Sequence, residues 1–273
     1  MVTTQRGGQA TEIARDAASR GVDVVAVHGG DGTINEVING IAGGTAALGV
    51  LPGGTANVWA KETGIVKDPV RAMQQLVQGR CQRVDLGVAN GRYFLLMAGV
   101  GLDALIVERT APALKRRTGA AAYVLAGIVT ALRTRPWTAD MRIDGVESRD
   151  VPLYWMLAGN TRSYGGLTDI MYRARADDGL LDVGVMHRGG PLRLLDATAR
   201  VFFNRHDRTK NVDYLTARVA EVLTPGIPVQ IDGERAGETP IRFEIAPLAL
   251  TAIVPRELRT PLLSAGSADP AAS

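Results

Sequence analysis

The fold of the first part of the chain is set by the stretch VDVVAVHGGDGT, residues 22–33. Its apolar run, residues 22–27, is typical of a buried parallel strand. A glycine-rich loop follows, and a helix is predicted to begin near Thr33, where Thr33 and Glu36 match a capping box. Glycines at such a junction let the backbone approach a phosphate, and the free amides at the helix start favour an anion. The same pattern also fits a tight turn in which Asp31 caps the helix.

A second unit of the same kind follows the first. The run 47–51 is a predicted strand, and it leads into the loop PGGTAN, residues 52–57. Helices are predicted over residues 9–20 and 68–79. Two glycine-rich loops at neighbouring strand ends form the crevice in which open α/β sheets bind ligands. The sequence therefore predicts an α/β nucleotide-binding domain with a parallel sheet over residues 1–83.

The pattern changes after residue 83, where strand-like runs meet at short turns. Asn90-Gly91 and Asp144-Gly145 are typical of hairpin turns. A β-rich domain is therefore predicted over residues 84–256, with a cleft between the domains and a disordered tail over residues 257–273. Strands are expected at 84–89, 93–97, 139–143, 153–158, 181–186, 215–223, 228–231, 241–245 and 250–254, and helices at about 112–133 and 191–204.

Bulk properties exclude several classes of protein. The 273 residues have a formal net charge of +3 and a pI of about 9.2, with no long basic run, so nucleic acid is not an expected partner. A single cysteine, Cys81, excludes a disulfide within the chain, and the three histidines lack metal-ligand spacing. The N-terminus lacks the apolar segment of a signal peptide, and no run is long enough to span a bilayer. We expect a cytoplasmic protein that at most rests on the inner face of the membrane.

Four motifs in a fixed order carry a family resemblance. GGDGT at residues 29–33 is followed by LPGGTAN at 51–57, DDGLLD at 177–182 and DGE at 232–234. Over residues 1–255 the chain resembles the catalytic part of the diacylglycerol kinase family, which includes bacterial lipid kinases and sphingosine and ceramide kinases. The resemblance implies an NAD kinase-like α/β domain followed by a β-sandwich. It also implies an ATP-dependent lipid kinase that uses Mg²⁺ and transfers the γ-phosphoryl group to a diacylglycerol-like or sphingoid hydroxyl.

The matched positions imply individual roles. Glu234 resembles the catalytic base, with Asp31 as the competing candidate. Asp178, with the backbone of Arg175 and of Leu180, resembles a structural or regulatory magnesium site. The positions that resemble the nucleotide-binding residues are Thr3 or Thr4, Gly29, Gly30, Asp31, Gly32, Thr33 and Thr55.

Lipid access requires apolar surface, for which the β-rich part offers candidates. Tyr154–Leu157 and Tyr164 fit either the lining of a lipid pocket or ordinary sandwich core. Lys115–Arg117, Arg133 and Arg135, together with Trp137, fit either a basic surface for anionic headgroups or a solvated helix end.

The chain departs from the family pattern at two places. Relatives begin with a further strand that carries an Asn-Pro motif, a unit of about 30 residues, and its absence would leave an exposed sheet edge that favours a homo-dimer. Val58 stands where many relatives have an aspartate. Two alternatives to a lipid kinase follow: a non-catalytic nucleotide- or lipid-binding relative, and a soluble-substrate kinase of the NAD kinase type, which only GGDGT supports.

Overall fold

The computed structural model describes residues 1–109, 130, 133–166, 168–187, 212–258 and 260–264. The helix expected at 191–204 lies outside these residues, as does the helix at 112–133 except for residues 130 and 133. Among the described residues, no helix is long and apolar enough to cross a membrane.

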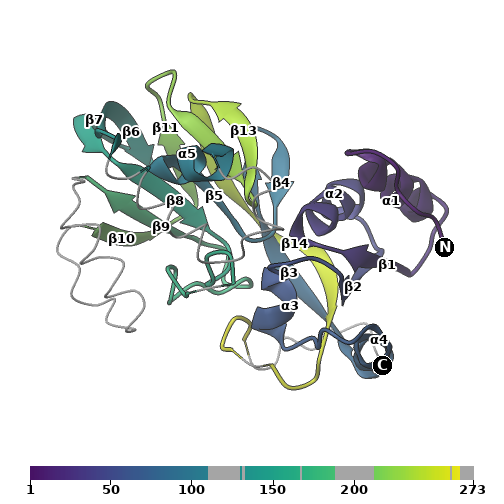
Figure 1. The fold of residues 1–273 in the computed structure, drawn as a ribbon. Coiled ribbons are helices and arrows are strands. Elements are labelled where there is room, and N and C mark those ends of the chain that lie inside the picture. The colour runs from purple at the N-terminus through teal and green to yellow at the C-terminus, as the bar shows by residue number, and fades with distance from the viewer. Residues whose placement is uncertain (110–129, 131–132, 167, 188–211, 259, 265–273) are drawn as a thin grey trace.

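The first part of the chain alternates helices and parallel strands, as predicted (Figure 1). Strands β1 (Val24–Gly29) and β2 (Ala47–Pro52) pair in parallel, with Val24 opposite Ala47. β2 is almost entirely buried, as expected for a parallel strand covered by helices. β1 lies at the edge of the sheet, and of its residues only Val27 is buried, so the prediction of a buried strand at residues 22–27 is wrong. The helices of this part are α1 (Gln9–Ser19), α2 (Asp31–Ile41), α3 (Val58–Thr63) and α4 (Pro69–Gln78).

The predicted capping box of α2 is wrong. The helix begins at Asp31 rather than near Thr33, and no side chain caps it. The Glu36 carboxylate instead accepts hydrogen bonds from the amides of Gly8 (2.9 Å) and Ala10 (3.0 Å), at the start of α1. These amides have no partner within α1, so a carboxylate from the neighbouring helix satisfies them and fixes the two helices together.

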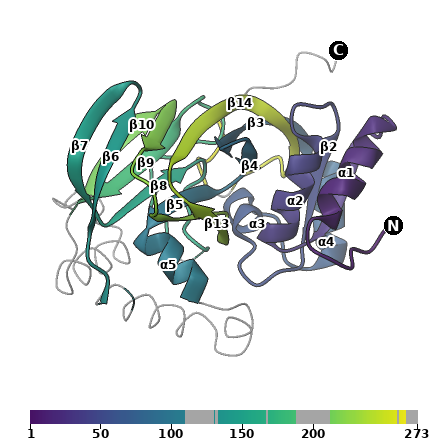
Figure 2. The same ribbon diagram turned by 90° about the horizontal axis from the view of Figure 1, so that it is seen from above.

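One eight-stranded sheet runs through both parts of the molecule, in the order β1-β2-β14-β11-β6-β7. Its long strand β14 (Ile241–Val254) pairs antiparallel with β11 and β3, and its end pairs parallel with β2. The two strands predicted at 241–245 and 250–254 are therefore one strand, irregular between Ala246 and Leu250. Figure 2 shows β14 arching from one half of the molecule to the other. The remaining strands of this sheet are β3 (Arg80–Ala89), β4 (Arg92–Phe94), β6 (Trp137–Ile143), β7 (Val146–Leu153) and β11 (Val219–Val222).

A second, antiparallel sheet completes a β-sandwich, in the order β10-β9-β8-β5-β12-β13. Side chains from both sheets share one buried core, in which Phe94 and Phe243 meet edge to face with ring centroids 6.4 Å apart. The predicted Asn90-Gly91 and Asp144-Gly145 hairpin turns are present, and all four residues have positive φ. This sheet comprises β5 (Met97–Gly101), β8 (Trp155–Gly159), β9 (Leu181–Met186), β10 (Val212–Ala217), β12 (Pro228–Ile231) and β13 (Glu234–Glu238), and helix α5 (Leu102–Arg109) follows β5.

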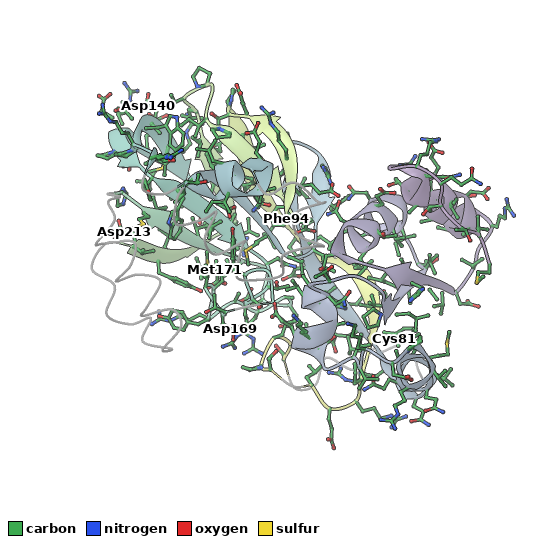
Figure 3. The ribbon with its side chains drawn as sticks, in the orientation of Figure 1. Cys81, Phe94, Asp140, Asp169, Met171 and Asp213 are labelled. Atoms are coloured by element: carbon green, nitrogen blue, oxygen red, sulfur yellow. The ribbon has the colours of Figure 1, made fainter. Side chains whose placement is uncertain are left out.

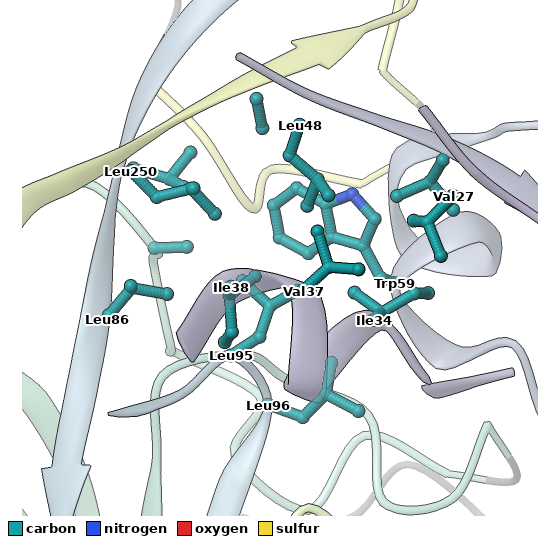
Figure 4. Packing of buried hydrophobic residues seen from close by; sticks show 14 of the residues in the cluster. Val27, Ile34, Val37, Ile38, Leu48, Trp59, Leu86, Leu95, Leu96 and Leu250 are labelled. Atoms are coloured by element: carbon teal, nitrogen blue, oxygen red, sulfur yellow. The ribbon is translucent and has the colours of Figure 1, made fainter. Parts of the chain in front are cut away.

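The α/β part has its own core, which packs around the fully buried indole of Trp59 (Figure 4). The C-terminal segment contributes to it, because Leu262 and Leu263 are 0% and 5% exposed. The Ala176 amide donates to the Leu262 carbonyl oxygen at 2.9 Å. For residues 257, 258 and 260–264 the expectation of a disordered tail is therefore wrong, because burying these two leucines offsets the entropy of ordering the segment.

Candidate active site

Two glycine-rich loops lie against each other at the ends of β1 and β2. The Gly53 amide donates to the Gly29 carbonyl oxygen at 2.8 Å. A Cβ atom built on Gly54 would lie 2.5 Å from Cα of Gly30, and one built on Gly30 would lie 3.2 Å from Cα of Gly54. The loops can touch only because both positions are glycine. Their backbones form one continuous surface at the carboxyl ends of parallel strands, where open α/β sheets bind ligands.

The start of α2 presents unused backbone donors to this surface. Gly30 is the N-cap residue, and within the described residues no side chain from outside the helix hydrogen-bonds to its first amides. Thr33 lies in the first turn and fills the space beside Gly29. A Cβ atom built on Gly29 would lie 2.8 Å from the Cβ of Thr33. Free amides and the positive end of the helix dipole together suit a phosphate group.

The Asp31 carboxylate ties the two loops together. Its Oδ1 accepts a hydrogen bond from the Val58 amide at 2.8 Å, at the start of α3. Burial raises the pKa of Asp31, and backbone amides of residues 57–59 oppose that rise. Asp31 thus caps the neighbouring helix α3. The alternative predicted from the sequence, in which Asp31 caps the helix that follows its own turn, is wrong.

Asn57 and Val58 shape the second loop. Asn57 has a φ of 48°, and its side chain accepts from the Gly54 amide (2.8 Å) and donates to the Gly54 carbonyl (2.7 Å). Val58 gives its amide to Asp31 and buries its side chain, 3% exposed, in the α/β core. The departure from the family pattern at position 58 therefore has a packing role in this chain. Thr55 is exposed at the tip of the same loop.

The Asp232-Gly233 turn between β12 and β13 is anchored by a buried carboxylate. Asp232 accepts hydrogen bonds from the three amides of residues 95–97, each at 3.0 Å. It also accepts from Nδ2 of Asn35 on α2, at 2.8 Å. Burial raises the pKa of Asp232 to about 6, against the opposing effect of these donors. The turn is thereby fixed both to the sandwich and to the helix that starts at the phosphate loop.

Glu234 follows this turn and reaches across to the first loop. A Cβ atom built on Gly32 would lie 2.9 Å from Oε1 of Glu234, so any larger residue at position 32 would contact the carboxylate. Oε2 accepts from Nη2 of Arg92 at 3.0 Å, and the same Nη2 lies 3.0 Å from Oδ1 of Asn35. The Glu234 side chain is 51% exposed, so the ion pair fixes its position and adds little stability.

A second buried carboxylate lies behind the same turn. Asp103 on α5 accepts a hydrogen bond from the Tyr164 hydroxyl and another from Nε2 of Gln230 at 2.7 Å. Gln230 in turn accepts from the Gly233 amide at 2.8 Å. Burial raises the pKa of Asp103 to about 6, and the hydrogen bonds from Tyr164 and Gln230 oppose the rise. Asp103 therefore connects α5 and the Tyr164 loop to the turn that precedes Glu234.

The predicted magnesium-binding residues lie apart from these loops, around the DDGLLD segment. Asp178 is exposed, and its Oδ1 accepts from the Leu180 amide at 3.0 Å. Burial raises the pKa of Asp178, as do the negative charges of Asp85 and Asp177. Arg175 makes an ion pair with Asp177 at 3.7 Å. Within the described part of the chain, no three His, Cys, Asp or Glu side chains are grouped to hold a metal ion.

Other predicted residues are placed differently. Thr4 lies in an exposed segment without regular structure, not at a strand end. Tyr154 and Met156 are fully buried in the core, which favours the sandwich-core interpretation, whereas Trp155 and Tyr164 are only half-buried. Arg133 and Arg135 are exposed and Trp137 is half-buried. The rest of the proposed basic surface, residues 115–117, lies outside the described residues.

Sequence reasoning missed the residues that hold the site together. Asn35 interrupts the apolar face of α2, and Asp103 interrupts the apolar run 98–107; both are signals that could have been used. Arg92 gave no signal, because one arginine after a hairpin turn is typical of a solvated surface. Its role depends on a contact between residues 142 positions apart.

Comparison with known proteins agrees with this geometry. The diacylglycerol kinase catalytic domain model matches residues 1–89, and the YegS C-terminal NAD kinase beta sandwich-like domain model matches residues 97–254. A "Probable lipid kinase YegS-like" of Chromohalobacter salexigens is 32% identical over 92% of this chain and 82% of its own length. A diacylglycerol kinase of Mycobacterium tuberculosis is 33% identical over 88% of this chain and 79% of its own. A solved diacylglycerol kinase structure from Bacillus anthracis superposes with a TM-score of 0.77 at 27% identity, over 93% of this chain and 85% of that one.

The paired glycine loops lie in an α/β unit that is joined to a β-sandwich of the NAD kinase-like kind. The chain belongs to the diacylglycerol kinase family, a family of lipid kinases.

Proposed function

We propose that the protein is an ATP- and Mg²⁺-dependent lipid kinase in which Glu234 is the catalytic base. The observation that supports this most directly is the position of Glu234 beside Gly32, in the first turn of α2. A phosphoryl group bound by the loop amides would lie within reach of a carboxylate that comes from the other half of the molecule.

The reaction divides between the two halves. The glycine loops bind and orient the nucleotide phosphates through backbone amides. The lipid hydroxyl gives its proton to Glu234 as its oxygen forms a bond to the γ-phosphorus, and the bond from that phosphorus to ADP breaks. Arg92 and Asn35 hold Glu234 in place. Positioning of this kind supplies most of the catalysis in phosphoryl transfer.

Glu234 suits the role of base better than Asp31 does. Asp31 is half-buried and uses Oδ1 to cap α3, so moving it toward a substrate would uncap that helix. Glu234 is half-exposed, and its partner Arg92 is a flexible side chain. We therefore assign Asp31 to the architecture of the phosphate loop.

The donor atoms suit the expected magnesium site. Asp178, with the backbone carbonyls of Arg175 and Leu180, supplies the hard oxygen ligands that Mg²⁺ prefers. A divalent cation there would offset the repulsion among Asp85, Asp177 and Asp178 that raises the pKa of Asp178. The Mg²⁺ that accompanies ATP supplies charge neutralisation at the phosphates.

The test is transfer of label from γ-labelled ATP in the presence of Mg²⁺ to a panel of lipids in mixed micelles. The panel includes diacylglycerol, phosphatidylglycerol, sphingosine and ceramide, with NAD as a soluble acceptor. We expect a labelled lipid with the wild type and a loss of at least about 100-fold in rate for Glu234→Gln. Glu238→Gln, the same change at an exposed position of the same strand, should keep full activity.

Three outcomes would contradict parts of the proposal. Equal activity of Glu234→Gln and wild type would exclude Glu234 as the base. Label on NAD but on no lipid would indicate a soluble-substrate kinase. Nucleotide binding without any transfer would indicate a non-catalytic relative.

A further inference from the structure

Helix α4 has an exposed apolar stripe. Val70, Met73 and Val77 are 68%, 43% and 80% exposed. Residues at positions i, i+3 and i+7 lie on one face of a helix. Nine large hydrophobic side chains are exposed among the described residues, and these three of them lie on this single ten-residue helix. Exposed apolar side chains that gather in this way mark an interaction surface.

The opposite face of α4 is fixed to the sheet, so the stripe cannot turn inward. Ala72 is 1% exposed. A Cβ atom built on Gly49 of β2 would lie 2.9 Å from the methyl groups of Leu76, and one built on Gly79 would lie 2.8 Å from Ile253. Figure 1 shows α4 at the margin of the α/β half, and Figure 3 labels the exposed Cys81 that follows it.

Cations lie on α4 and in the segments that flank it. Within the described part of the chain, none of them forms an ion pair with a carboxylate, and three of them donate to neutral groups: the Gln82 side chain, the Leu248 carbonyl and the Gln78 carbonyl. Asp68 and Glu257 are the acidic residues of the same segments, and Asp68 is occupied in capping α4. The surface is therefore strongly positive. The cations are Lys67, Arg71, Arg83 and Arg256, together with Arg80, which shares with Gln82 the face of β3 turned away from α4.

A cleft of about 400 Å³ opens beside the end of the helix. It is lined by Gln75, Gln78, Pro255 and Arg256. The Gln75 amide is hydrogen-bonded to the backbone of Gly64 and Val66, so the Gln78 amide and the Arg256 guanidinium remain as polar groups for a ligand. Amide and guanidinium N–H groups are good donors to phosphate oxygens. A phosphate headgroup next to the stripe would have partners there.

We propose that α4 is a membrane-docking helix that binds an anionic bilayer. Val70, Met73 and Val77 enter the acyl boundary, while Lys67, Arg71 and Arg256 face the headgroup phosphates. A second copy of this chain is a poorer occupant, because pairing two α4 surfaces would bring like charges together. None of these residues belongs to the candidate active site, so the docking surface goes beyond the proposed kinase function.

The test is sedimentation of the full chain, without ATP, with vesicles of phosphatidylcholine alone or with phosphatidylglycerol added. We expect binding to the anionic vesicles that weakens as salt is raised. The double variant Val70→Ser/Val77→Ser should bind about tenfold more weakly, because two apolar side chains are lost from the boundary. Its control is Val146→Ser, a 71% exposed valine on β7, which should bind like the wild type.

A second pair of variants tests the charge. Lys67→Gln/Arg71→Gln should bind anionic vesicles about tenfold more weakly, while Arg15→Gln on α1 should not change binding. Neither double variant should change the melting temperature or the kinase activity in detergent micelles. The kinase assay in detergent micelles needs no bilayer, so it tests the kinase proposal separately from docking.

Two results would overturn the docking proposal. One is vesicle binding that is absent in the wild type or unchanged in both double variants. The other is a dimer in sedimentation velocity that Val70→Ser/Val77→Ser dissociates, which would make α4 a surface for self-association.

Discussion

Gly30 and Gly54 decide whether two loops can share one surface. Neither residue has a positive φ, so their role is the space that they leave rather than an unusual backbone conformation. Each stands where a methyl group would meet the other loop. At the scale of single residues, the site thus depends on two missing side chains as much as on the carboxylates of Asp31 and Glu234.

Gly54→Ala should separate the loops. Its Cβ would lie 2.5 Å from backbone atoms of Gly30, which can move only with the loop. We expect a loss of about 1–3 kcal/mol in the free energy of unfolding and weaker nucleotide binding, measured by denaturant titration and calorimetry. Gly7→Ala is the control, because its Cβ would meet nothing closer than 4.0 Å. Unchanged nucleotide affinity in Gly54→Ala would argue against a site at the contact between the loops.

Helix α2 joins the two halves at the scale of elements. Its first turn lies beside Glu234, and Asn35 contacts Asp232, Arg92 and the Tyr93 carbonyl. The same helix binds α1 through Glu36. It is therefore the element through which a change in the phosphate loop would reach the Asp232-Gly233 turn.

Asn35→Ala should lower activity and stability together. It removes a donor to the buried Asp232 carboxylate and the Arg92 contact that positions Glu234, and we expect a loss of about 2 kcal/mol in the free energy of unfolding. Asn39→Ala is the matched variant, because Asn39 joins the same helix to Tyr93 without touching Asp232. It should cost about 1 kcal/mol and leave the rate per folded molecule unchanged. Equal loss of rate in both variants would show that Asn35 acts only through stability.

At the scale of the whole molecule, three carboxyl groups share one electrostatic property. Burial raises the pKa of Asp103, Asp182 and Asp232 to about 6 in each case. Two of them border the candidate site, and Asp182 lies in the second sheet, where it accepts a hydrogen bond from Tyr214. The folded state therefore holds protons on these groups up to a higher pH than the unfolded chain does.

Asp182→Asn should change the pH dependence of stability. The protonated carboxyl group stabilises the folded state fully below the ordinary pKa of 3.8, and that contribution is lost as pH rises through about 6. The stability of the wild type relative to the variant should fall between about pH 4 and pH 6, by at most about 1.4 kcal/mol per pH unit, and level off above pH 7. Asparagine keeps an oxygen for Tyr214, so the two proteins differ mainly in this titration. Parallel denaturation curves across that range would contradict the raised pKa of Asp182.

The amino-acid sequence alone determined the local features of this protein. Its periodicities predicted α1, β1, β2 and α4 within a few residues, because an apolar run or stripe is a property of neighbours in the chain. The turn pairs Asn90-Gly91 and Asp144-Gly145 likewise act within a few residues. The four motifs predicted the family, which the comparisons show.

Only the tertiary structure decided the roles of side chains whose partners lie far away in the sequence. Glu36 caps another helix, Asp31 caps α3, and Leu262 returns to the first core, although each had a plausible local role. The contact of Glu234 with Gly32 and Arg92 exists because β14 spans both halves of the molecule and brings the sandwich up to the glycine loops. Such contacts follow from the path of the chain in space, and a pattern of neighbouring residues does not specify that path.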